Sequence, residues 1–440
     1  MERAQTHYLD EINSLARKIL SYDPKKPSLY GNAERYFASQ QGNVSLTENE
    51  FTSFFTHMDD LVQTLISLTE GESRSDTLGK SARFLGSLFH LSPGGKAHQP
   101  KVNKKLKPLY RAVTTARFLD ELLLEGYCKT GHIRQHWEGT SRFSDKNARK
   151  RYLQQVITPL YYSLLSFDAG LFHPEAKALL SGECKHSPKD EFRTLNNNER
   201  RKLLEINERH SLSFLKLVLE RKKQYLRKTA DYDEIKVQEF SEFAITTFKL
   251  KGQSEKELGS AIKISQIYAS LILATKREQC RSETVNAMYH VVEHANKGEV
   301  KLELANKFQA MFGLFPQGFG IACLVERADN SMKPWELAVV NKLYPADPAQ
   351  PHCRIVTRRL EYNRSTIDVD VSIKQNLFFS ESREKLSYLL SPAVRKSLEV
   401  LSSKSEKELE AELIPPSWDP HELFTSRDLS VWSNVSYKSD

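Results

Sequence analysis

Apolar residues recur at helical spacing along most of the chain. Thr47 and Glu50 form a capping box, and apolar side chains follow three or four residues apart over 51–65. Asp76 is the expected cap of the next helix, and the Gly-, Lys- and Pro-bearing stretch 94–107 is expected to be a loop. The same spacing predicts helices over 78–89, 113–123, 156–165, 203–219, 262–273, 285–292 and 302–312.

The pattern changes after Pro316. Short apolar or β-branched runs occupy 321–325, 335–340 and 353–356. Residues 366–372 alternate with period two, so Ile367, Val369 and Val371 are expected on one face of a strand. These runs predict a β-meander of about 55 residues, too small to fold alone and therefore packed on the helices.

The fold class expected from this pattern is mostly α, a helical bundle with a small β-meander. We divide the chain into an N-terminal helical module (1–130), a helical domain (131–315), a β extension (316–375) and a C-terminal helix with an irregular tail (376–440). The last helix is expected over 386–401, and the tail is expected from residue 415.

Composition argues against several classes of protein. The 440 residues are 39% hydrophobic and 27% charged, which argues against a disordered chain. Five scattered cysteines without a Cys-x-x-Cys pair make a disulfide framework improbable and favour a reducing cytoplasm. The N-terminus lacks a signal-peptide core, and the uncharged runs contain Pro, Gly and Gln, so no membrane insertion is expected.

The formal net charge of +8 is concentrated in two clusters. Their basic residues attract phosphate groups under one interpretation and form a solvated helix face under the other. Few aromatic residues are interleaved with either cluster, which weakens the interpretation as a nucleic-acid binder. The clusters consist of Lys101, Lys104, Lys105, Lys107 and Arg111, and of Arg221, Lys222, Lys223, Arg227 and Lys228.

Metal-ligand spacing occurs once in a short motif. His290, Glu293 and His294 fit the pattern H-x-x-E-H, which places two imidazoles on one side of a helix with a carboxylate nearby. A zinc site there needs a third ligand, for which the sequence offers no candidate. Other ligand-type residues lack a standard finger spacing, namely His173, Cys184 and His186.

Five segments in order carry a resemblance to a known family. They are the apolar helix and turn at 161–174, Arg209-His210-Ser211, the helix at 262–271, the helix at 282–294, and 302–318 with the Leu-Phe-Pro-Gln-Gly turn. Together they resemble the HD-GYP domain of HD-superfamily phosphohydrolases over about residues 131–350. The resemblance implies an HD-superfamily-like helical bundle. In such a domain, histidines and aspartates hold the metal ions with which the enzyme hydrolyses cyclic di-GMP.

The departures from the family pattern fall on its metal ligands. Phe167 stands where the histidine of the His-Asp pair is expected, whereas Asp168 is kept. Gln266 replaces the last aspartate, and His210 is retained. Phenylalanine has no lone pair, so we interpret this domain as degenerate and expect neither a metal cofactor nor catalytic residues.

Other elements of the family's site also differ in this sequence. The paired histidines are missing from 243–247, and the GYP loop is reduced to 250–252. His132 and His136 are both candidates for the family's first histidine.

The resemblance implies a non-catalytic signalling protein that binds cyclic di-GMP or another nucleotide, or a protein partner through residues 1–130. Basic side chains would then replace the lost metals opposite the phosphates, and Arg209, Lys251 and Lys263 lie on the bordering segments. Two alternatives stay open: a residual metal-dependent phosphohydrolase, and a basic polyanion or nucleic-acid binder.

Overall fold

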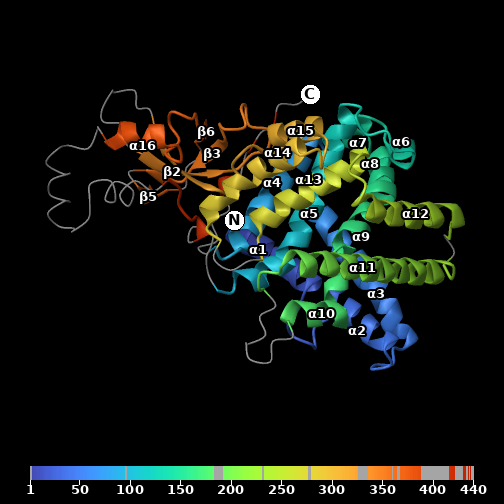
Figure 1. Cartoon of the computed structure of the whole chain (residues 1–440). Coiled ribbons are helices and arrows are strands. Elements are labelled where there is room, and N and C mark those ends of the chain that lie inside the picture. Colours follow the sequence, from blue (N-terminus) through green and yellow to red (C-terminus); the bar gives the residue numbers. More distant parts are fainter. Residues whose placement is uncertain are drawn as a thin grey trace.

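The computed structural model describes residues 2–94, 97–182, 192–229, 232–275, 279–325, 335–358, 360–363, 367–387, 416–421, 430–432, 435 and 437. Helices form most of this part of the chain, and a small antiparallel sheet lies at one end of the molecule (Figure 1). The expectation of a mostly α fold with a C-terminal β part is confirmed.

Long helices form the first part of the chain. They are α1 (Glu2–Ile19), α2 (Leu29–Gln40), α3 (Glu48–Thr69), α4 (Arg74–Leu91) and α5 (Gln99–Leu124). Short helical elements follow, namely α6 (Gly131–His136), α7 (Ser141–Ser144), α8 (Lys146–Tyr152), the π-helical turn η1 (Leu153–Ile157), α9 (Thr158–Ser166), the 3₁₀ turn η2 (Ala169–Phe172) and α10 (Pro174–Ser181).

The later helices include two that project together from the body (Figure 1). These two are α11 (Asn197–Leu226) and α12 (Glu234–Leu250). They are followed by α13 (Glu257–Ile272), the 3₁₀ turn η3 (Arg281–Val285), α14 (Asn286–Asn296) and α15 (Leu302–Phe312).

Local signals set several helix ends. The capping box of α3 is confirmed, since the Thr47 N–H donates to the Glu50 carboxylate at 2.8 Å and the Glu50 N–H donates to the Thr47 hydroxyl. The cap predicted for α4 is wrong: Ser73 accepts the Asp76 N–H at 3.0 Å. Asp76 instead lies in the first turn, where its carboxylate accepts the Glu72 N–H at 3.0 Å.

The loop expected over 94–107 is also wrong for its second half, because α5 begins at Gln99. Pro100 lies in the first turn of α5, where a helix needs no N–H from that residue. Basic residues here therefore belong to a helix whose inner side is buried. Because the segment is helical, Lys104, Lys107 and Arg111 lie on the same side of α5.

Helix α5 is the central element, packed against α1, α4, α9 and α13. Among the described residues, most buried apolar side chains form one continuous cluster, from Leu9 on α1 to Tyr437 in the tail. A small second cluster consists of Ala322, Leu324 and Leu377. Burial of this apolar area is the main force that holds the helices around α5.

A buried ionic network crosses this core. Arg142 lies 3.1 Å from Glu70 and 3.0 Å from Asp120, and Arg117 lies 3.2 Å from Asp120 and also pairs with Glu70. The Tyr152 hydroxyl donates to Asp120 at 3.1 Å. Burial raises the pKa of Glu70, but the two guanidinium groups outweigh it and hold this pKa below its usual value. The network joins the end of α3 to α5 and α7.

The predicted meander is present as an antiparallel sheet in the order β1-β2-β3-β6. One expected side-chain position is wrong: Ile367 is 60% exposed, whereas Val371 is buried. The edge strand begins only after Ile367, so alternation does not carry this residue into the core. The strands are β1 (Gly320–Leu324), β2 (Trp335–Val340), β3 (His352–Ile355), β4 (Thr357–Arg358), β5 (Glu361–Tyr362) and β6 (Asp368–Asp370).

Described parts of the C-terminal tail cover the sheet and α4. The Trp418 indole donates to the Ala338 carbonyl at 3.0 Å, and the Tyr437 hydroxyl accepts the Leu343 N–H at 3.1 Å. The helix α16 (Ser380–Ser387) covers only the beginning of the helix expected over 386–401. Residues 388–415 lie outside the described part of the chain.

Candidate functional site

The segment that carries the family resemblance is fixed by α11. The Phe167 carbonyl, just after α9, accepts the Asn207 amide at 2.8 Å and the Ser211 hydroxyl at 3.2 Å. Ser211 in turn accepts the Gly170 N–H at 2.7 Å. A Cβ on Gly170 would lie 2.3 Å from the Asn207 carbonyl oxygen, so only glycine permits this approach. Phe167 and Asp168 are therefore held rigidly.

Asp168 is paired with a cation of α5. Its Oδ2 lies 3.1 Å from Arg111 Nη1, and the Arg111 side chain is only 2% exposed. Arg111 also donates to the Leu164 carbonyl at 2.7 Å, and its guanidinium lies 5.0 Å from the Phe167 ring centroid. A guanidinium thus stands beside the retained carboxylate of the family motif.

Two lysines complete what we name the Asp168 cluster: Arg111, Lys107, Lys251 and Asp168. Burial lowers the pKa of Lys107 and of Lys251, and the neighbouring Asp168 partly opposes this. For Asp168, burial acts to raise the pKa, but Arg111, Lys107 and Lys251 together hold it below its usual value. The cluster therefore has three basic groups and one carboxylate.

Phe167 fills the interior beside this cluster. Its ring is fully buried and packs edge-on against Phe248 at a centroid distance of 5.1 Å. The Lys251 ammonium lies over this ring, 5.1 Å from the Phe167 centroid. The aromatic ring thus occupies the interior position, and the cations of Lys251 and Arg111 lie over it.

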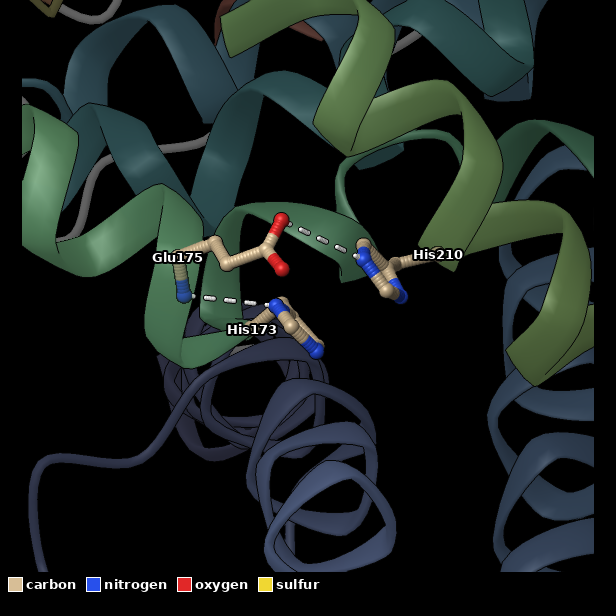
Figure 2. Close-up of side chains that lie close together, drawn as sticks. All are labelled: His173, Glu175 and His210. Atoms are coloured by element: carbon tan, nitrogen blue, oxygen red, sulfur yellow. Dashed lines mark hydrogen bonds and ion pairs between the residues drawn. The ribbon is translucent and has the colours of Figure 1, made fainter. Parts of the chain in front are cut away.

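His210 and Arg209 lie in a second group, next to α10. The imidazoles of His173 and His210 stack with a centroid distance of 3.5 Å, and Glu175 lies beside both (Figure 2). Burial, with His173 and Arg209 nearby, lowers the pKa of His210 to about 4. Burial also lowers the pKa of His173. Both rings are therefore neutral near pH 7.

The Asp168 cluster and the histidine pair do not form one metal site. Among the described residues, the close group of three metal-ligand types is His173, Glu175 and His210, whose ligand atoms lie within 4.8 Å of one another. Asp168 is not a member. Asp168 and His210, the two residues expected to be retained from the family's metal site, therefore lie in different surroundings.

The remaining candidates lie elsewhere. Lys263 donates to the Glu299 carbonyl at 3.1 Å, and Gln266 is half-buried on the same helix, α13. Glu299 also accepts His294 Nδ1 at 2.9 Å, whereas His290 contacts Glu293 at 3.2 Å. The two histidines of the H-x-x-E-H motif therefore have separate carboxylate partners.

The two candidates for the family's first histidine are near neither group. His132 stacks on Phe243 at a centroid distance of 4.4 Å, and its Nε2 contacts the Gln155 carbonyl at 2.8 Å. His136 packs against His132 and lines a surface cavity near α12. Cys184 and His186 lie outside the described residues.

The two basic clusters differ in their surroundings. In the second cluster, Arg221 pairs with Glu48 at 2.9 Å and Lys222 pairs with Asp59 at 2.5 Å. In the first, Arg111 turns into the core and Lys107 has no hydrogen bond or ion pair with another described residue. The first cluster is thus the one with unneutralised charge near the motif.

Sequence reasoning did not assign Lys107, Arg111, His173 or Glu175 to these groups. Lys107 and Arg111 were recognised as part of a basic cluster. Because residues 94–107 were predicted to form a loop, the sequence did not show that both lie on the same side of one helix. His173 and Glu175 flank Pro174 at the start of α10, and only folding brings α11 next to them.

A scan of protein-family models, a search of curated proteins and a search of solved structures each return no match. The resemblance to HD-GYP domains stays a prediction from the sequence. Within the described residues, no helix combines the length and the apolar character that crossing a bilayer requires.

Proposed function

We propose that this chain is a non-catalytic regulatory protein that binds a phosphate-bearing ligand, with nucleotides as the first class to test. The observation that carries the proposal is the half-buried pair Lys107 and Lys251. Neither ammonium has an ion pair or a hydrogen bond within the described part of the chain, and the nearby Asp168 already pairs with Arg111. Burying charge without compensation is costly, and a bound phosphate would supply the missing negative charge.

The environment of Lys251 includes one further acid. Glu208, an exposed residue of α11, attracts Lys251 only weakly compared with Asp168. Even with Glu208, the lysines and Arg111 outnumber the carboxylates. The net positive charge of this group therefore favours an anionic ligand over a cationic one.

A large cavity is lined by residues that lie one turn along the chain from members of the Asp168 cluster. It has a volume of about 1070 Å³ and is lined by residues of α2, η2 and α10, including Phe172 and Lys177. Lys104 also lines it, one helical turn before Lys107, and its ammonium lies 4.9 Å from the Phe172 centroid. This volume is comparable with that of ligand pockets, which usually measure about 300–1,000 Å³.

The surroundings of Asp168 support binding without hydrolysis. Metal-dependent phosphodiester hydrolysis needs several oxygen or nitrogen donors around each ion. Here the groups facing Asp168 are Arg111, Lys107 and Lys251, which are cations. They compensate phosphate charge but do not activate a water molecule as a bound metal does.

The test is isothermal titration calorimetry on the full chain with cyclic di-GMP, GTP and inorganic pyrophosphate. The resemblance to HD-GYP domains places cyclic di-GMP first. The double variant K107M/K251M should bind the same ligand at least tenfold more weakly, because each charged contact contributes about 1.5–3 kcal/mol.

Lys301→Met is the matched control. Lys301 is also half-buried, but it pairs with Glu257 at 2.8 Å and is part of neither site. Its variant should bind as the wild type does. Equal binding by K107M/K251M and the wild type, or no binding of any of the three anions, would contradict the proposal.

A further inference from the structure

We propose that His173, Glu175 and His210 form an exchangeable binding site for a borderline transition-metal ion such as Zn²⁺. This site lies outside the Asp168 cluster and is independent of the phosphate-binding proposal. It also differs from the H-x-x-E-H motif on α14.

The three residues come from two elements that pack together. His173 is the cap of α10, Glu175 is the second residue of that helix, and His210 lies on α11, which packs against α10. Pro174 fixes the first turn of α10, so the spacing between His173 and Glu175 is set by rigid backbone. Rigid elements hold ligands more accurately than loops do.

Neighbouring donors determine which imidazole nitrogens carry lone pairs. The Glu175 N–H donates to His173 Nδ1 at 3.3 Å, so this nitrogen is an acceptor, and an ion bound to it would replace this capping hydrogen bond. Arg209 Nη2 lies 3.2 Å from His210 Nε2, and a guanidinium can only donate. Both lone pairs thus lie on the nitrogens nearest Glu175 (Figure 2). Unprotonated imidazole nitrogens are the form that metals bind.

Arg209 already places positive charge where an ion would lie. Its Nη2 is 2.9 Å from Glu175 Oε2 and 3.2 Å from His210 Nε2, the two atoms that an ion would bind. The guanidinium is on an exposed side chain, so it can leave. The same pair of acceptor atoms therefore already accommodates one cation, which a metal ion would replace.

Coordination requires a small movement. His210 Nε2 and Glu175 Oε2 lie 4.0 Å apart, whereas two ligand atoms of a tetrahedral Zn²⁺ site lie about 3.3 Å apart. The stacked rings, 9° from parallel, direct their in-plane lone pairs side by side and not to one point. His210 is half-buried and must tilt out of the stack, and Phe37 packs edge-on against both rings.

The ligand set identifies the class of ion. Two imidazoles and one carboxylate favour Zn²⁺, Ni²⁺ or Cu²⁺ over Mg²⁺ and Ca²⁺, which prefer oxygen. Glu175 is exposed, so water can fill the remaining positions. Three protein ligands with an open position are typical of exchangeable sites and not of closed structural sites.

The test is calorimetric titration of the EDTA-treated full chain with ZnCl₂, together with the visible spectrum after CoCl₂ addition. One equivalent of Zn²⁺ should bind, and Co²⁺ should give the absorption bands of a four- or five-coordinate site. H173A and H210A should each lower the affinity at least tenfold. R209A should raise it, because the competing cation is removed.

Three further variants make the result decisive. E175Q changes only an exposed side chain, so it preserves the fold and should weaken binding several-fold. H290A and H294A are matched histidine controls on α14 and should leave the affinity unchanged. The absence of Zn²⁺ binding, or binding lost in the α14 variants but retained in H173A and H210A, would overturn the proposal.

Discussion

Arg111 Nη1 lies 3.1 Å from Asp168 Oδ2, which joins the middle of α5 to the turn after α9. In sequence, Arg111 belongs to a basic cluster for which a solvated face was one of two interpretations. In the structure it is buried and also binds the Leu164 carbonyl. One residue therefore links the central helix to the motif that carries the family resemblance.

Loss of this ion pair should destabilise the fold. R111M leaves Asp168 with only Lys107 and Lys251 as compensation, and we expect a loss of about 3 kcal/mol in the free energy of unfolding, at the lower end for a broken buried pair. Urea denaturation followed by circular dichroism measures it. In the double variant R111M/D168N the losses should be less than additive by more than 0.5 kcal/mol, and simple additivity would argue against direct coupling.

Asp168 should make stability depend on pH at the acidic end. Its pKa in the folded state is lowered from the usual 3.8, so its ionised form stabilises the fold above that pH. The stabilisation is lost as the pH falls through 3.8 to the lower folded value. The difference in unfolding free energy between wild type and D168N should be constant from pH 6 to 7 and shrink below about pH 4. The exposed Asp10→Asn serves as control, and a difference independent of pH would refute this assignment.

The same carboxylate should oppose anion binding. D168N removes the negative charge nearest Lys107 and Lys251, so pyrophosphate should bind several-fold more tightly than to the wild type. Titration at 50 and 200 mM NaCl should show a steeper salt dependence for the variant. Weaker binding by a folded D168N protein would mean that Asp168 contacts the ligand favourably.

Gly170 should not tolerate a side chain. A Cβ there would meet the Asn207 carbonyl oxygen at 2.3 Å, so G170A should separate η2 from α11 and cost about 1–3 kcal/mol. Gly131 has open space around the corresponding position, which makes G131A the matched control. Thermal unfolding of both variants tests this, and equal midpoints would contradict the close packing.

The buried network should be sensitive to loss of one charge. E70Q leaves Arg117 and Arg142 with Asp120 as the shared carboxylate, and we expect a loss of about 3–5 kcal/mol. E48Q, at an exposed ion pair with Arg221, is the control and should change stability by less than about 1 kcal/mol. Urea denaturation distinguishes the two cases.

Much of the secondary structure follows from local patterns. The helices around Leu65, Leu122 and Leu271 were predictable because apolar residues recur every three or four positions. The start of α5 was not predicted, since Gly94 and Pro100 are common in loops, although a proline is equally compatible with the first turn of a helix. Ile367 was misplaced because alternation alone does not show where an edge strand begins.

The candidate sites show the same division. Sequence indicated the unusual Phe167-Asp168 pair and named Lys251 and His210. It could not show that Lys251 lies beside Asp168, or that His210 stacks on His173, because these contacts join elements 37 to 83 positions apart.

Sequence by itself determined the helical fold class, the antiparallel meander and the presence of phenylalanine at a position where the resembled family has a metal ligand. These depend on side-chain periodicity and on the chemistry of single residues. The tertiary structure alone decided which charges are buried together, because the packing of α5, α9, α11 and α12 sets the distances between side chains that are remote in sequence. Electrostatic interactions vary with distance and burial, so the Asp168 cluster exists only in the folded chain.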